Sequence, residues 1–202
     1  AGAVVCDSLD EFDDAITLFT LLDGKRAKGR RLAAVSNGGY ECVAIADNLG
    51  EMVLSHFSER TKTELEVIYK DAHISEIVDI HNPLDLTPMA DDDAYERAVR
   101  TVLMDPESDL CIVGIIPLTA KLNTLASGPL SHGEDILRPN SLPERLGRLS
   151  SEMDKPFIAI VDSGPLYDPF SAELEKRGIP TFRAADRALR MLERWRKAHQ
   201  RI

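Results

Sequence analysis

The chain has 202 residues, of which 44% are hydrophobic, so it is long enough for one large α/β domain with a real core. Its 34 acidic residues outnumber its 24 basic ones and give a net charge of −10, which argues against nucleic acid as the main partner. No apolar run reaches the roughly 18 residues of a membrane span and no signal peptide is visible, so we expect a cytoplasmic protein that does not enter a membrane.

Residues 1–30 predict a leading helix followed by a basic linker, ahead of a sheet domain at 31–202. Ser8 and Glu11 form a capping-box pattern at the helix start, and Gly24 ends the helix. Because the chain starts with Ala1 rather than Met, we expect this single domain to be a fragment of a larger multidomain protein. The helix has one apolar face, which predicts its buried side and is made of Leu9, Phe12, Ile16, Phe19 and Leu22.

Five short apolar runs predict strands, near residues 32, 52, 110, 157 and 180, with helical patterns between them. The run LCIVGIIP at 110–117 is the most hydrophobic and predicts the central strand. Alternating strands and helices indicate a three-layer (αβα) α/β fold, in which helices cover both faces of a doubly wound, parallel, five-stranded sheet. The flavodoxin-like strand order 2-1-3-4-5 places a ligand at the carboxyl ends of the strands that end near Ser36 and Pro117.

A glycine turn follows the first strand at this edge. It consists of Ser36, Asn37, Gly38 and Gly39, and a helical pattern starts at Tyr40. A strand that turns sharply into a helix presents free N–H groups and the positive end of the helix dipole, which favour an anion such as phosphate. The same turn is also ordinary α/β connection chemistry, so the motif leaves both interpretations open.

The segment NPLDLTP at 82–88 is expected to be a loop that folds over the same edge. Pro83 keeps Asn82 out of the helical region, and the next proline does the same to Thr87. Between them, Asp85 either accepts N–H groups of its own turn or contacts a ligand.

Two more loops should reach this edge, after Pro117 and at Asp162-Ser163-Gly164. Asp162 ends a strand, so it is either the N-cap of the next helix or a ligand contact. The irregular region 118–142 exceeds normal loop length, which predicts a flexible lid or a short helix within it.

Cysteine and histidine spacing gives no metal site. Cys6, Cys42 and Cys111 are far apart and flanked by apolar residues, so we expect reduced and mostly buried thiols. His132 lies in a glycine-flanked loop and is the one histidine considered as a phosphoryl carrier, without further support. His81 is expected to order its own loop.

Four segments together resemble the NDP-forming (ADP-forming) acyl-CoA synthetases, relatives of succinyl-CoA synthetase. They are SNGGYECVAIAD (36–47), NPLDLTP (82–88), YERAVRTVLMDPESDLCIVGIIPLT (95–119), and KPFIAIVD with GIPTFRAADRALRML (155–162 and 178–192). The resemblance covers almost the whole chain. It implies the second of two tandem flavodoxin-like CoA-ligase domains, in which a helix N-terminus stabilises a phosphohistidine.

The resemblance implies that the turn from Ser36 to Tyr40 supports phosphoryl transfer. It also implies no tightly bound cofactor, with CoA, ADP or ATP, and phosphate as substrates of the intact enzyme. The family's histidine segment, CoA-binding domain and ATP-grasp domain are not in this sequence, so other domains or subunits would supply them and the chain would be inactive alone. A homodimer is a further expectation.

Two alternatives stay open. Tyr40 and Glu41 stand where family members usually have small residues, and a carboxylate at Glu41 would repel phosphate. This departure favours a non-catalytic assembly or docking module that retains the fold. The third interpretation is a small flavodoxin-like domain that binds a nucleotide or a flavin.

Overall fold

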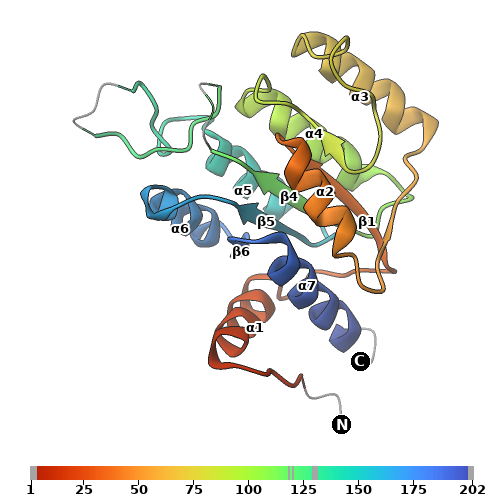
Figure 1. The fold of residues 1–202 in the computed structure, drawn as a ribbon, viewed down its shortest axis with the longest axis vertical. Coiled ribbons are helices and arrows are strands. Elements are labelled where there is room, and N and C mark those ends of the chain that lie inside the picture. Colours follow the sequence, from red (N-terminus) through yellow and green to blue (C-terminus); the bar gives the residue numbers. More distant parts are fainter. Residues whose placement is uncertain (1–3, 118, 120, 129–131, 200–202) are drawn as a thin grey trace.

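The structure is a computed structural model that describes residues 4–117, 119, 121–128 and 132–199 (Figure 1). The strands are β1 (Arg31–Ser36), β2 (Val53–Leu54), β3 (Leu84–Asp85), β4 (Leu110–Ile115), β5 (Phe157–Val161) and β6 (Thr181–Phe182). The helices are α1 (Leu9–Leu21), α2 (Gly39–Asp47), α3 (Glu59–Asp71), α4 (Asp92–Met104), α5 (Leu142–Glu152), α6 (Asp168–Lys176) and α7 (Ala185–His199), with a 3₁₀ turn at Pro165–Tyr167.

All strand pairs are parallel, and the sheet order is β2-β1-β4-β5-β6. The five predicted strands and their flavodoxin-like order are confirmed. The predicted total of five strands is wrong, because the sheet has a sixth strand. This additional strand, β3, pairs with the end of β1 at Val35 and Ser36. A two-residue strand between prolines has too few residues to show a periodic pattern, so this segment was expected to be a loop.

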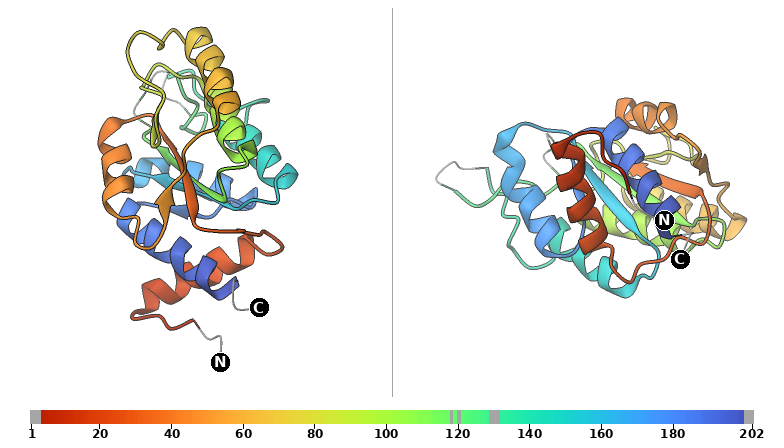
Figure 2. Two further views of the ribbon diagram at one scale, coloured as in Figure 1. Left: turned by 90° about the vertical axis from the view of Figure 1, so that its right-hand side faces the viewer. Right: turned by 90° about the horizontal axis from the view of Figure 1, so that it is seen from below.

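The sheet separates two apolar layers, as the αβα prediction requires. Successive residues of a strand point to opposite faces. In β1, Leu32 and Ala34 pack under α1, α2 and α7, whereas Ala33 and Val35 pack under α3 to α6. The same alternation runs through β4 and β5, whose residues are buried throughout. Figure 2 shows helices on both sides of the sheet.

The chain leaves neighbouring strands toward opposite layers. After β1 it enters α2 on one face of the sheet, and after β4 it continues to α5 on the other face. The carboxyl ends of β1 and β4 therefore form the point where the winding reverses, which is where a doubly wound fold binds its ligands.

The prediction for the buried face of α1 is wrong for three of its five residues. Leu22 is buried and Phe19 packs partly against the core, but Leu9, Phe12 and Ile16 are more than half exposed. Helix α1 packs against α7 (Figure 2). Three arginines of α7 pair with three acidic residues of α1 or its start, and Glu11 and Asp14 become half-buried: Arg187 pairs with Asp14, Arg190 with Glu11, and Arg194 with Asp7 and Glu11.

The segment after β4 is held by side-chain contacts, and its described residues contain no helix. Residues 118, 120 and 129–131 lie outside the described part. Asp92 accepts from Asn123, Glu134 accepts from the backbone and hydroxyl of Thr124, and Leu122 is buried. The short helix, one of the two alternatives predicted for 118–142, is therefore absent from the residues that the structure describes.

Two further predictions concern thiols and membranes. Cys42 and Cys111 are free and buried, as predicted, while Cys6 is half-buried. Within the described residues, no helix has the length and apolar character needed to cross a bilayer.

Candidate functional site

The glycine turn is fixed to the end of β4 by one side chain. The amide of Asn37 both donates to the Ile116 carbonyl (2.9 Å) and accepts from the Ile116 N–H (2.8 Å), and Asn37 is only 1% exposed. The Ser36 hydroxyl, also buried, accepts from the Gly38 N–H (3.3 Å). These residues shape the turn, so their own polar groups are already used.

The start of α2 has two backbone donors with bonding capacity left. The N–H groups of Glu41 and Cys42 bond to the Gly38 carbonyl, but no hydrogen bond joins the N–H of Gly39 or Tyr40 to another described residue. Gly38 is the N-cap, and no side chain caps this helix. Free donors at the positive end of a helix dipole are the basic requirement of an anion site.

Both glycines of the turn lie close to side chains of neighbouring elements. A Cβ on Gly38 would lie 2.2 Å from Cδ1 of Ile116, and one on Gly39 would lie 3.3 Å from Oδ2 of Asp85. The backbone of the turn therefore passes close to Ile116, which follows β4, and to the Asp85 carboxylate at the end of β3.

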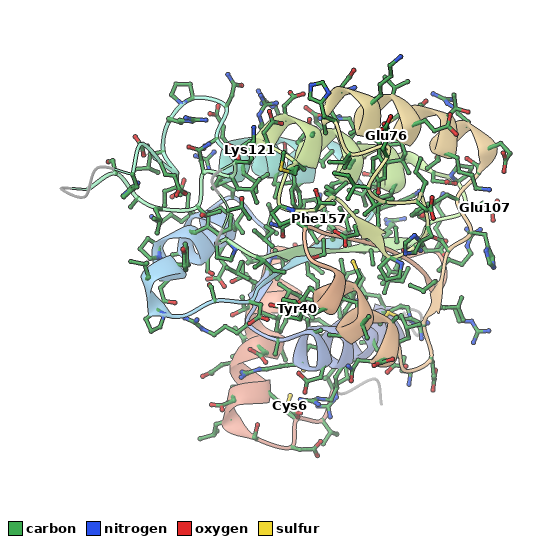
Figure 3. The ribbon with its side chains drawn as sticks, turned by 45° about the horizontal axis from the view of Figure 1, so that its top comes forward. Cys6, Tyr40, Glu76, Glu107, Lys121 and Phe157 are labelled. Atoms are coloured by element: carbon green, nitrogen blue, oxygen red, sulfur yellow. The ribbon has the colours of Figure 1, made fainter. Side chains whose placement is uncertain are left out.

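Tyr40 connects the turn to the end of β5. It lies at the start of α2 (Figure 3), is 57% exposed, and its hydroxyl donates to Asp162. The 3₁₀ turn that follows has Gly164 as its N-cap, so Asp162 is not the cap of the next helix. The predicted neighbours Ser163 and Gly164 lie beyond this contact, where the Ser163 carbonyl accepts from Arg183.

The Glu41 side chain is buried between the start of α2 and strand β4. It is 2% exposed, and its Oε1 has no hydrogen-bond partner among the described residues. Gly114 makes room for it, because a Cβ there would lie 2.8 Å from the Glu41 Cγ and 3.0 Å from the Ser36 hydroxyl. Burial, and then the negative charge of Asp162, raise the pKa of the Glu41 carboxyl from 4.5 to about 7.

The NPLDLTP segment is divided between the site and the sheet. Asp85 ends β3 next to the turn and accepts from the Thr87 N–H (2.8 Å), while the Thr87 hydroxyl accepts from the Met89 N–H. Asp85 thus stabilises its own turn, which is one of the two roles considered for it, and its other oxygen faces Gly39.

Asn82 and Pro83 do not reach the turn. The Asn82 side chain accepts from the Ala34 N–H (2.9 Å) and donates to the carbonyls of Leu32 (2.8 Å) and Ser55 (3.0 Å). It therefore replaces ladder bonds between β1 and the end of β2. Pro83 is buried after a cis peptide bond, and Pro117 is buried with its carbonyl bonded to the Thr124 hydroxyl.

The histidines give no catalytic arrangement. His132 accepts from the Glu134 N–H through Nδ1 (3.1 Å), and His81 bonds the Asp79 carbonyl, so both stabilise local turns. In the described part of the chain, no three histidine, cysteine or acidic side chains cluster as a metal site would require.

Sequence reasoning missed the burial of Glu41 and the individual contacts that residues at the end of β4 make with the turn. Glu41 was considered only as a carboxylate that would repel phosphate, and a glutamate two residues after paired glycines carries no sequence pattern that indicates burial. The end of the strand at 110–117 was predicted to lie at this edge, but Gly114, Ile116 and Tyr95, whose hydroxyl donates to the Gly114 carbonyl, were not predicted as site residues. A glycine inside the most hydrophobic strand was the one available indication of a close approach.

Three comparisons with known proteins place the chain among its relatives. No family model matches the chain. The alpha subunit of acetate–CoA ligase (ADP-forming) II from Pyrococcus furiosus is 26% identical over 185 residues, which are 90% of this chain and 36% of the relative. The resemblance to the ADP-forming acyl-CoA synthetases is confirmed.

Solved structures confirm the predicted α/β fold. A crystal structure of a Pyrococcus horikoshii OT3 protein superposes with a TM-score of 0.76 at 22% identity, over 98% of this chain and 42% of that one. A dinucleotide-forming acetyl-coenzyme A synthetase 1 from Ca. Korarchaeum cryptofilum, in complex with phosphate and ADP, superposes with a TM-score of 0.76 at 19% identity. The match covers 98% of this chain and 39% of that one. The chain thus spans 36–42% of the length of these three proteins.

Proposed function

We propose that this chain is a ligase domain of an ADP-forming acyl-CoA synthetase, whose glycine turn, residues 36–40, stabilises the phosphoryl group during its transfer. The observation that supports this most is the pair of free N–H groups at Gly39 and Tyr40, at the start of α2 and at the reversal point of the sheet. One relative is named as an ADP-forming acetate–CoA ligase subunit, and a structural neighbour, named as an acetyl-coenzyme A synthetase, was solved with phosphate and ADP.

The chemistry proposed is phosphoryl transfer between a phosphohistidine, acyl-CoA with phosphate, and a nucleotide. The turn contributes donors that are already oriented, since Asn37 holds it to β4 and Ser36 holds Gly38. Such donors stabilise developing negative charge without having to reorganise during the reaction. CoA, ADP or ATP, and phosphate are substrates of the intact cytoplasmic enzyme, and other domains or subunits supply the histidine and the nucleotide site. The isolated domain is inactive alone.

One observation favours a second candidate function, an assembly module without catalysis. The carboxyl groups of Asp85, Glu41 and Asp162 all lie around the turn, and Tyr40 spans it. Three ionised carboxyls would oppose an anion by several times the energy of one such pair in water, about 1 kcal/mol at 4 Å. A module of this kind would bind the other synthetase domains, or a second copy of itself, through its surface.

Amide NMR titration of the 202-residue chain with inorganic phosphate distinguishes the two functions. We expect saturable shifts confined to Asn37 to Glu41. Gly38→Val should abolish them, because its side chain displaces Ile116. Gly128→Val is the matched control, since a Cβ at Gly128 meets nothing closer than 3.9 Å, and it should bind like the parent.

The assembly function is favoured instead if phosphate at tens of millimolar moves no amide of the turn while circular dichroism shows a folded chain. Equal shifts in the parent and in Gly38→Val would also contradict binding at the turn.

A further inference from the structure

We propose that Glu41 makes anion binding at the glycine turn proton-linked: the site takes a tetrahedral oxyanion together with a proton on the Glu41 carboxyl, which then donates a hydrogen bond to an anion oxygen. This inference rests on the proposed phosphoryl-binding function and adds the regulation of that site by pH.

The first support is the position of the carboxyl. Glu41 belongs to the same helical turn whose Gly39 and Tyr40 amides are free, and it is held against the Gly114 backbone and the Ser36 side chain. Its Oε1 is buried and unpartnered within the described structure. A buried polar atom without a partner is energetically unfavourable, so a bound group that satisfies it would be favoured.

The second support is the charge of the surroundings, taken from every element packed against Glu41. Asp162 faces it from the end of β5, Tyr95 from α4, and Tyr40 and Cys42 from its own helix, with Asp85 close to Cys42 at the end of β3. None of these groups is a cation. An ionised Glu41 would therefore add negative charge next to the anion, without a compensating positive side chain among its neighbours.

Protonation of Glu41 changes both its charge and its hydrogen-bonding capacity. The neutral carboxyl loses its repulsion and gains an O–H donor that can complete the pair of backbone donors at Gly39 and Tyr40. Burial raises the pKa of Glu41 to about 7, so small changes around neutral pH change its state. The proton comes from solvent and returns to it when the anion leaves, and no bond to phosphorus forms or breaks in this step.

Sulfate is the appropriate probe, because it is a tetrahedral oxyanion whose charge does not change between pH 6 and 8. We would measure its dissociation constant by amide NMR at both pH values for the parent chain, Glu41→Gln, Glu41→Ala and the exposed control Glu76→Gln. With a pKa near 7, the parent should bind about tenfold more weakly at pH 8 than at pH 6. Glu76→Gln should behave in the same way.

Glu41→Gln should bind equally at both pH values, because its amide is a permanent neutral donor. Glu41→Ala should also lose the pH dependence, but should bind more weakly than the parent at pH 6, since it has no donor. The inference is overturned if sulfate binds at the turn with the same pH dependence in Glu41→Gln and in the parent, or with no pH dependence in the parent; the proposed function survives both results. Absence of sulfate binding in all four proteins overturns the function and the inference together.

Discussion

Helices α2 and α4 each bury a carboxyl group in their first turn, but only one of the two is fully hydrogen-bonded within the described structure. Asp92 of α4 is 5% exposed, and its two oxygens accept from the backbone N–H of Asn123 (2.9 Å) and from its side-chain amide (2.7 Å). Glu41 of α2 is 2% exposed with an unpartnered Oε1. Burial raises the pKa of both carboxyls.

The two helices also begin differently. The Asp91 side chain caps α4 by accepting from the Ala94 N–H (2.9 Å), whereas α2 starts at Gly38 without a side-chain cap. A helix start that satisfies its own donors and its own buried carboxyl has a structural role. The start of α2 leaves both unsatisfied, and this difference, more than the presence of glycine, identifies it as a candidate site.

The largest effect should come from Asp92→Ala. It leaves the backbone N–H and the side-chain amide of buried Asn123 without their acceptor, which should lower the free energy of unfolding by about 3 kcal/mol. Urea denaturation measures this. The neighbouring Asp93→Ala is the control, because Asp93 forms exposed pairs with Arg145 and Arg97 and should cost less than about 1 kcal/mol. Equal losses in both variants would mean that Asp92 is not the anchor of the segment after β4.

Glu41→Gln should have the opposite sign and depend on pH. Since the folded-state pKa is raised from 4.5 to about 7, the contribution of Glu41 to stability is most favourable below pH 4.5, and about 3 kcal/mol of it is lost as pH rises to 7 and above. Glutamine is neutral at every pH and avoids this loss. The variant should match the wild type near pH 4.5 and exceed it at pH 8 in urea denaturation. A variant that is less stable at pH 8 would show that the charged carboxyl is satisfied in the folded state.

Tyr40→Phe should have the smallest effect. It removes a half-exposed hydrogen bond to Asp162 and should cost about 0.5–1 kcal/mol. A decrease in the free energy of unfolding much above 2 kcal/mol in the same assay would mean that the Tyr40 contact stabilises the start of α2 as strongly as the Asp91 cap stabilises α4. The contrast between the two helices would then be lost.

The sequence predicted the central sheet well, because burial on both faces leaves β1, β4 and β5 as uninterrupted apolar runs. It failed where tertiary contacts override local pattern. Helix α1 shows an apolar face, yet Arg187, Arg190 and Arg194 of α7 attract its acidic residues and leave Leu9 and Phe12 exposed.

The backbone pattern of the candidate site could be predicted from the sequence, but the side-chain contacts that shape the site could not. The turn Ser36 to Tyr40 has a local pattern of strand, glycines and helix. The partner of Asn37 at Ile116, the space above Gly114 and the burial of Glu41 depend on residues more than seventy positions apart. For the same reason Asn82 was assigned to the site, although its contacts are with β1 and Ser55.

The most direct test of the account is the titration of the Glu41 side-chain carboxyl by ¹³C NMR, without and with saturating sulfate. We predict a midpoint near pH 7 in the free chain, as burial next to Asp162 requires, and a higher midpoint with sulfate bound. A midpoint near 4.5, or one that sulfate leaves unchanged while the turn amides show it bound, would contradict the claim that Glu41 takes up a proton with the anion.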